Sequence, residues 1–260
     1  MQSRRRGGAD PRRFLVIVPD VVAPPGLLGE AIIGKGCFYD TLMPTARYAS
    51  HAPFDYPGVP RTSDGYAGLV VLGGGMSAND VAAHPFLVEV MTLVRRFDED
   101  GKPVLGVCLG AQIVARSYGG EVYRMGRLES GFCEMELTAE GRADPLFSRA
   151  GDRVTVFHNH YEAVRNVPGA VVLATGGACP VQAFRIGERV YGLQWHIEVT
   201  IDIVREWIRT YGHQFCRDEP RLVTDLDRQF GIHFPSYRRA CRRLVERWMA
   251  LGSRPPATAD

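Results

Sequence analysis

The sequence predicts an α/β fold in which a mostly parallel sheet has helices on both faces. Short apolar runs of strand length, such as Phe14–Val18 and Leu69–Leu72, alternate with segments of helical periodicity. This alternation is expected when parallel strands are buried on both faces. The chain of 260 residues is 45% hydrophobic and 23% charged, which is the composition of a globular protein with an apolar core.

Each element follows from a local pattern, taken in chain order after these first two strands. Apolar residues recur at helical spacing over 85–98, and a glycine and a proline at 101 and 103 end that helix. The strand Val104–Val107 then leads into a helix over 109–118. Shorter strands are expected at 121–123, 133–137, 154–157, 171–174, 181–184 and 190–193, before a helix from 202 to about 215.

The two ends of the chain differ from this pattern. Residues 1–13 form an Arg-rich tail that we expect to be disordered, and residues 14–215 form the domain. Residues 216–260 are Arg-rich with apolar residues at helical spacing, which predicts a C-terminal helical extension. Dimerisation or partner docking through Leu244 and Trp248 is a hypothesis for that extension.

Charge and cysteine usage exclude several classes of protein. The net charge is only +2 and much of the positive charge lies in the tail, so the body lacks the basic face of a nucleic-acid-binding protein. No apolar run approaches the about 18 residues of a membrane span. The six cysteines are scattered without C-x-x-C pairs, which indicates neither a disulfide framework nor a zinc knuckle and favours a reducing cytoplasm.

The most informative stretch is Gly106-Val107-Cys108-Leu109-Gly110, where a buried strand runs directly into a helix. It is the thiol counterpart of the G-x-S-x-G nucleophile turn. Glycines are needed on either side because the turn is tight, and the turn raises the cysteine above the sheet. The start of the helix favours a thiolate. We therefore expect Cys108 to be a nucleophile.

A thiolate nucleophile needs a proton shuttle and donors for an oxyanion. His196 and Glu198 come at the end of an apolar strand, where residues two apart point the same way, so Glu198 can orient His196. The amide of Leu109 is expected to donate to the oxyanion. A second donor is expected from the glycine run 73–75 that follows another strand.

These motifs resemble the class I (triad) glutamine amidotransferases. The resemblance rests on residues 106–112 and 192–198, and it extends through the loop 73–76 and the segments 129–132, 159–160 and 178–180 in the order of the glutaminase domain of GMP synthase. It covers roughly residues 68–204. It implies a flavodoxin-like domain that hydrolyses the side-chain amide of glutamine and needs no metal or organic cofactor for that step.

The resemblance also implies a role for each matching residue. Cys108 is the nucleophile, His196 the general base and acid, and Glu198 the group that orients it. The backbone amides of Gly74 and Leu109 form the oxyanion hole. The residues expected to hold the substrate are Gln112, Glu129, Ser130, Gly131 and Phe132.

Some residues depart from the family pattern. Ile197 replaces the proline that commonly separates the histidine and glutamate, and Tyr161-Glu162 replaces a Gly-Asp pair. His158 and His160 suggest a metal site, but two histidines on one strand without a third ligand favour a structural role.

Three functions remain open from the sequence. The chain is expected to release ammonia from L-glutamine for a partner synthase acting in trans, because it contains no phosphate-binding loop of its own. The alternative is a self-sufficient hydrolase of γ-glutamyl compounds, which needs the same chemistry. The third is a catalytically silent regulatory module, against which the intact Cys108, His196 and Glu198 argue.

Overall fold

The computed structural model describes residues 10–45, 58–218 and 220–252, and within the helices it leaves the side chains at 213–216 and 221 undescribed. Most of the expected N-terminal tail lies outside these residues, and Arg13 already belongs to the first strand. Among the described helices, none combines the length and apolar character needed to cross a membrane.

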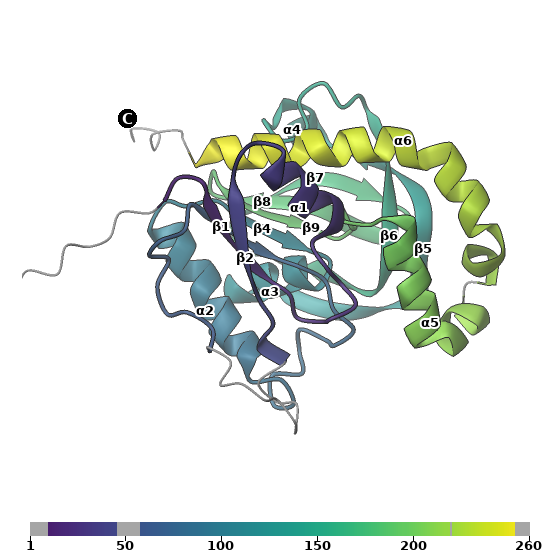
Figure 1. The fold of residues 1–260 in the computed structure, drawn as a ribbon, viewed down its shortest axis with the longest axis horizontal. Coiled ribbons are helices and arrows are strands. Elements are labelled where there is room, and N and C mark those ends of the chain that lie inside the picture. Colours follow the sequence, from purple (N-terminus) through teal and green to yellow (C-terminus); the bar gives the residue numbers. More distant parts are fainter. Residues whose placement is uncertain (1–9, 46–57, 219, 253–260) are drawn as a thin grey trace, which may run out of the picture.

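The described strands form one curled sheet (Figure 1). The strands are β1 (Arg13–Ile17), β2 (Phe38–Leu42), β3 (Gly68–Val71), β4 (Val104–Val107), β5 (Glu121–Leu137), β6 (Arg153–Arg165), β7 (Ala170–Gly176), β8 (Cys179–Ile186) and β9 (Val190–Leu193). Their order across the sheet is β2-β1-β3-β4-β9-β8-β7-β5-β6. Strands β2, β1, β3, β4 and β9 are parallel, and the remaining pairings are antiparallel. The predicted α/β class is confirmed.

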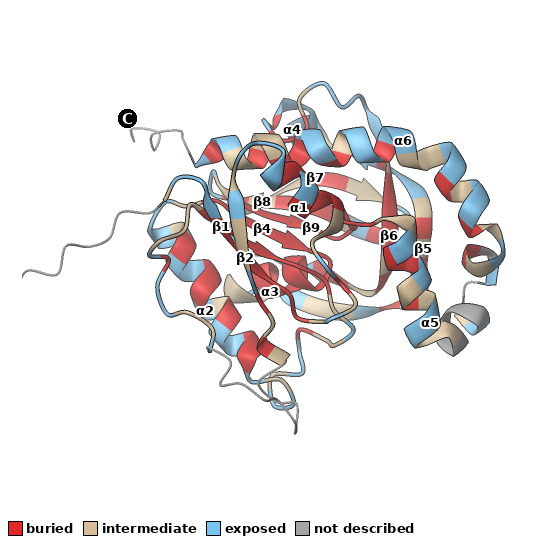
Figure 2. Ribbon diagram, viewed as in Figure 1, coloured by how far each residue is buried: buried red, intermediate tan, exposed pale blue. Residues whose placement is uncertain are grey.

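Helices cover both faces of the sheet. They are α1 (Gly26–Ile33), α2 (Phe86–Glu99), α3 (Leu109–Ser117), α4 (Ala139–Ala143), α5 (Ile201–Asp218) and α6 (Pro220–Leu251). Along β1, Phe14 and Val16 pack with α1 and α6, whereas Leu15 and Ile17 pack with α2 and α3. This alternation follows from the two-residue period of a strand, and it leaves the central strands buried throughout (Figure 2).

The sequence pattern did not predict three of the observed elements, and it predicted two separate strands where the structure has one. The helices α1 and α4 and the strand β2 were not expected. Strand β2 is an edge strand with mostly exposed or half-buried residues, and α1 is a short helix whose apolar residues do not form a narrow stripe. The strands expected at 121–123 and 133–137 are the two ends of β5, whose pairing with β6 shifts register between Arg124 and Glu129.

Helix α6 lies along one face of the sheet (Figure 1). Trp248 is fully buried with its ring 5.4 Å from that of Phe14, and Leu244 is 8% exposed. The hypothesis that Leu244 and Trp248 dock a partner is therefore wrong, because both side chains belong to the core. Their spacing indicated a buried helix face correctly, but the face packs against this chain's own sheet.

Candidate active site

The turn at Cys108 has the strained geometry expected of a nucleophile turn. Strand β4 ends at Val107, and α3 begins at Leu109. Between them Cys108 has φ +52° and ψ −110°, a conformation that side-chain-bearing residues rarely adopt. A Cβ at position 110 would overlap the carbonyl oxygen of Val71, and one at position 106 would overlap Gly110. Both glycines are therefore required for strand, turn and helix to pack this closely.

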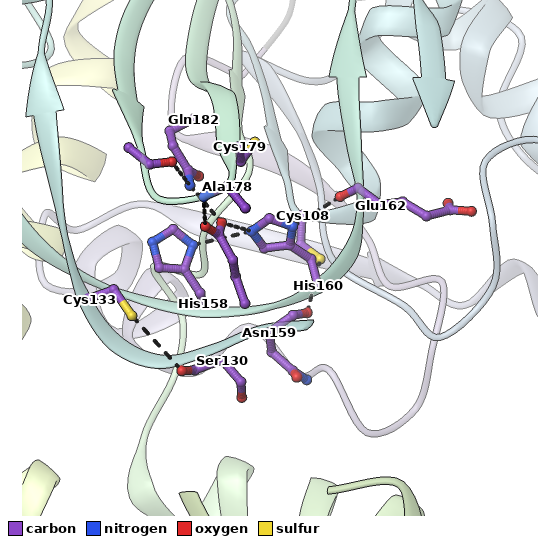
Figure 3. Close-up of polar contacts among 12 residues, drawn as sticks. Cys108, Ser130, Cys133, His158, Asn159, His160, Glu162, Ala178, Cys179 and Gln182 are labelled. Carbon is purple, nitrogen blue, oxygen red and sulfur yellow. Dashed lines mark hydrogen bonds and ion pairs between the residues drawn. The ribbon is translucent and has the colours of Figure 1, made fainter. Parts of the chain in front are cut away.

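Cys108 lies at the N-terminus of α3, on the wall of a cavity of about 590 Å³. Its side chain is only 5% exposed, and its Sγ is 3.9 Å from the carbonyl oxygen of Asn159 on β6 (Figure 3). The N-terminal end of a helix stabilises negative charge. The fold thus places the thiol at the start of a helix and at a cavity where a ligand can reach it.

His196 and Glu198 follow β9 and form a short hydrogen bond in the interior. Nδ1 of His196 donates to Oε1 of Glu198 over 2.6 Å, and the other carboxylate oxygen accepts from the amide of Ile197 at 2.8 Å. Burial alone would lower the pKa of His196, but the charges of Glu198 and Cys108 raise it to about 10. The carboxylate of Glu198 therefore favours the protonated form of the ring.

The other ring nitrogen of His196, Nε2, is buried and has no hydrogen-bond partner among the described residues. Cys108 lies on this side of the ring and, with Glu198, raises the pKa of His196. A Cβ at Gly73 would be 3.1 Å from Cε1 of His196 and 3.5 Å from Cβ of Cys108, so this glycine allows the two side chains to approach. The structure therefore brings the three residues Cys108, His196 and Glu198 together.

Tyr237 on α6 holds the backbone of the histidine. Its hydroxyl donates to the carbonyl oxygen of His196 at 3.0 Å, and the residue is 2% exposed. The amide of His196 donates to the carbonyl of Phe157 on β6 at 2.9 Å. Both backbone groups of His196 are thus fixed. No local sequence signal marks Tyr237, because the contact depends on how α6 packs across the sheet.

The expected oxyanion donors line the same cavity. Gly74 and Leu109 are both on its wall. The amide of neighbouring Gly75 donates to Oδ2 of Asp20 at 3.2 Å, whereas the amides of Gly74 and Leu109 donate to no described residue. The hydrogen atoms of the two amides assigned to the oxyanion are therefore available to a ligand.

The expected substrate-holding residues divide into two groups. Gln112 lines the cavity, with its Nε2 donating to the carbonyl oxygen of Glu162 at 3.2 Å. The side chains of Ser130 and Phe132 instead line a separate hollow of about 310 Å³ beneath α6, and Gly131 lies against Gln229 of that helix. These three residues do not line the Cys108 cavity, because α6 covers this part of β5.

Glu129 also turns away from the Cys108 cavity. Its carboxylate accepts from the amide of Ala178 at 2.6 Å and from Nε2 of Gln182 at 2.9 Å, and lies 3.2 Å from Nε2 of His160. Of these residues, His160 lines the cavity. Glu129 can therefore affect a bound substrate only through His160.

Several charged residues of the cavity were not expected from the sequence. Asp20, Asp80 and Glu162 line it, with Arg124 as the basic side chain among the described lining residues. Asp20 accepts from the hydroxyl of Tyr211 at 2.9 Å, and burial together with this carboxylate raises the pKa of Tyr211 to about 12. A signal for Asp20 existed, because it follows the carboxyl end of a parallel strand, where α/β sheets bind ligands.

The family follows from comparison with known proteins. Residues 43–206 match the family model of class-I glutamine amidotransferases. This match covers more than half of the chain, so the chain belongs to that family of enzymes.

Individual relatives agree with this assignment. The chain is 31% identical over 160 residues to the glutamine amidotransferase-like protein YfeJ of Salmonella typhimurium, covering 58% of this chain and 64% of the relative. It is 37% identical over 133 residues to a glutamine-hydrolysing GMP synthase subunit of Methanoregula boonei, covering 50% and 65%. It is 40% identical over 149 residues to the GMP synthase of Aeropyrum pernix, covering 55% and 27%. The chain thus spans less than two thirds of the length of these relatives.

Solved structures extend the likeness over almost the whole chain. A glutamine amidotransferase from Thermotoga maritima superposes with a TM-score of 0.75 at 26% identity, covering 91% of this chain and 97% of that one. A second, from Methylobacillus flagellatus, has a TM-score of 0.77 at 24% identity and covers 92% and 95%. Because its identity is below 25%, the second match supports the fold alone.

Proposed function

We propose that this protein is a glutaminase that hydrolyses the side-chain amide of L-glutamine through Cys108, His196 and Glu198. The carrying observation is the assembly of these three side chains, with the 2.6 Å hydrogen bond between Nδ1 of His196 and Oε1 of Glu198, beside a cavity that Cys108 and His196 line. A thiolate beside an imidazolium is the activated form of a cysteine nucleophile. Membership of the family supports the same chemistry.

The proposed reaction has two halves. The thiolate of Cys108 attacks the δ-carbon of glutamine, and the resulting oxyanion accepts hydrogen bonds from the amides of Gly74 and Leu109. The C–N bond then breaks as Nε2 of His196 donates its proton to the leaving ammonia. Water next attacks the γ-glutamyl thioester and loses a proton to His196, which releases glutamate and restores the thiolate.

The ammonia is proposed to serve a partner synthase in trans. The support is that several relatives are named as one of the subunits of a GMP synthase. In this proposal the chain supplies ammonia while a second polypeptide binds the acceptor.

The cavity favours a second candidate, a self-contained γ-glutamyl hydrolase. A volume of about 590 Å³ is within the range of about 300–1,000 Å³ that holds ligands larger than a single amino acid. The leaving group of a γ-glutamyl amide would occupy the part of the cavity beyond Cys108. The bond broken and the roles of the triad are unchanged.

A competition assay tests both candidates. The purified protein is given L-glutamine and a γ-glutamyl dipeptide in equal amounts, and glutamate, ammonia and the released amino acid are measured. Ammonia as the main product supports the glutaminase, and release of the amino acid supports the hydrolase. Cys108→Ala should abolish either activity, whereas Cys133→Ala, at an exposed cysteine, should not.

Labelling with a glutamine analogue tests the site without requiring the partner synthase to be present. An analogue with a diazoketone in place of the amide alkylates a cysteine nucleophile that binds the glutamyl group. We expect one adduct per chain on Cys108, found by peptide mass spectrometry. A folded protein that turns over neither substrate and is not labelled at Cys108 would be the silent module instead.

A further inference from the structure

A second histidine–carboxylate cluster lies beside the triad. Glu129 on β5 is paired in register with His160 on β6, and Gly131 with His158, so the three side chains share one face of the two strands. Nε2 of His160 is 3.2 Å from Oε2 of Glu129 and 3.3 Å from Nδ1 of His158. All three residues are buried, and Figure 3 shows the rings of His158 and His160 close to Ala178 and Gln182.

The hydrogen bonds of His160 leave one nitrogen that needs a positive partner. Its Nδ1 is 3.0 Å from the carbonyl oxygen of Glu162, which can only accept, so Nδ1 carries a hydrogen. In the neutral ring, Nε2 then has a lone pair and no hydrogen. This lone pair faces a carboxylate oxygen of Glu129, which is also an acceptor. Nδ1 of His158, 3.3 Å away, can donate a hydrogen to this lone pair, but a metal ion between the three side chains would bind the lone pair and the carboxylate oxygen together.

The spacing of the three side chains suits a metal ion. Zinc binds nitrogen and oxygen at about 2.0–2.2 Å, so its ligand atoms in a tetrahedron are about 3.3–3.5 Å apart. Nε2 of His160 is 3.2 Å from Oε2 of Glu129 and 3.3 Å from Nδ1 of His158, which is close to this ligand-to-ligand distance. One ligand atom from each of the three residues lies within 4.8 Å of the other two.

Surrounding groups hold the carboxylate in place. The amide of Ala178 and Nε2 of Gln182 donate to the two oxygens of Glu129, and a Cβ at Gly177 would overlap one of them. Oε1 of Gln182 is buried without a partner among the described residues, so it can accept from a metal-bound water. Metal ligands are commonly oriented by such outer hydrogen bonds.

We propose that Glu129, His158 and His160 bind one divalent transition-metal ion of the zinc type through Oε2, Nδ1 and Nε2, with water as the fourth ligand. The sequence disfavoured a metal here because the strand of the two histidines carries no third ligand. The neighbouring strand β5 supplies it. The site does not use the triad, so the proposal does not depend on the proposed glutaminase activity.

Metal analysis in a Cys108→Ala background tests the proposal, because that background removes the thiol as a competing zinc ligand. The protein is stripped with a chelator, reloaded with Zn²⁺ and passed through gel filtration. We expect one zinc per chain. Glu129→Gln and His158→Asn should each weaken binding by more than about 100-fold, since loss of an outer hydrogen-bond partner alone costs about 10–100-fold. The matched change His84→Asn, outside the cluster, should retain the metal.

X-ray absorption of the zinc-loaded Cys108→Ala protein gives a readout that does not depend on the folding of the variants. The proposal requires two imidazoles and further oxygen ligands with no sulfur. A sulfur ligand, or zinc retained equally by folded Glu129→Gln and His158→Asn, would overturn it. A parent protein that keeps no zinc would also overturn it and would place a proton between His160 and Glu129.

Discussion

The two buried histidine–glutamate pairs, His196 with Glu198 and His160 with Glu129, have the same chemical groups in different surroundings. His196 uses one ring nitrogen for its carboxylate and leaves Nε2 facing Cys108. His160 uses one nitrogen for a backbone carbonyl and the other for the carboxylate, beside His158. A histidine with an uncommitted nitrogen can transfer a proton, whereas one with both nitrogens engaged can only bind or hold. The residue next to each pair, Cys108 beside His196 and His158 beside His160, therefore sets the role of that pair.

Glu198→Gln should give the largest change if this comparison is right. The amide cannot stabilise the imidazolium, so we expect kcat to fall by about 10²–10⁴-fold, as when the orienting carboxylate of a triad is neutralised. The pKa of His196 should fall from about 10, which an NMR titration of the ring would detect.

The pH dependence of stability follows from the same pair. Because the folded pKa of His196 is raised, its stabilising contribution is complete below the unfolded value near 6.5 and is lost as the pH rises towards 10. Glu198→Gln should remove this decline in the free energy of unfolding. An unchanged kcat in Glu198→Gln would mean that the pair is only structural.

Glu129→Gln should change stability more than catalysis. Glu129 accepts hydrogen bonds from the amide of Ala178 and from Nε2 of Gln182, and losing a buried hydrogen bond to a charged group costs about 1.5–3 kcal/mol, which urea unfolding at pH 7 would show. Because the pKa of Glu129 is lowered to about 2, the stabilisation is present above about pH 4.5 and is lost as the pH falls towards 2. We expect kcat to stay within severalfold of the wild type. A loss of kcat as large as in Glu198→Gln would remove the distinction between the pairs.

Tyr237→Phe tests whether α6 positions His196. Removing the hydroxyl deletes one buried hydrogen bond, worth about 1 kcal/mol. We expect kcat to fall by up to about tenfold with KM unchanged, because the histidine backbone is held less firmly. Tyr66→Phe removes a hydrogen bond to Asp40 far from the triad and should leave kcat unaltered. Equal kinetics in the two variants would limit Tyr237 to a structural role.

Ile197→Pro should give the smallest effect. Proline has no amide hydrogen, so the variant loses the 2.8 Å bond from position 197 to Glu198 and keeps the bond from His196. We expect a decrease in kcat of about threefold, from steady-state kinetics. A decrease as large as that of Glu198→Gln would show that the carboxylate depends on the amide of Ile197.

Local signals predicted most of the sheet and the centre of the site. The glycines around Cys108 and the two-residue spacing of His196 and Glu198 are contained in short segments, and the structure brings those side chains together. Contacts between distant segments carry no such signal. Glu129 meets His160 because of the register of β5 and β6, and Tyr237 reaches His196 because α6 crosses the sheet.

The order of synthesis gives the C-terminal helix a further consequence. Every strand of the sheet leaves the ribosome before Tyr237 and Trp248 are made, so the apolar face around Phe14 stays uncovered during that interval. His196 meanwhile lacks the hydrogen bond to its carbonyl oxygen. A nascent chain is therefore exposed to chaperones and proteases until α6 packs over this face, and the same step fixes the backbone of His196 through Tyr237.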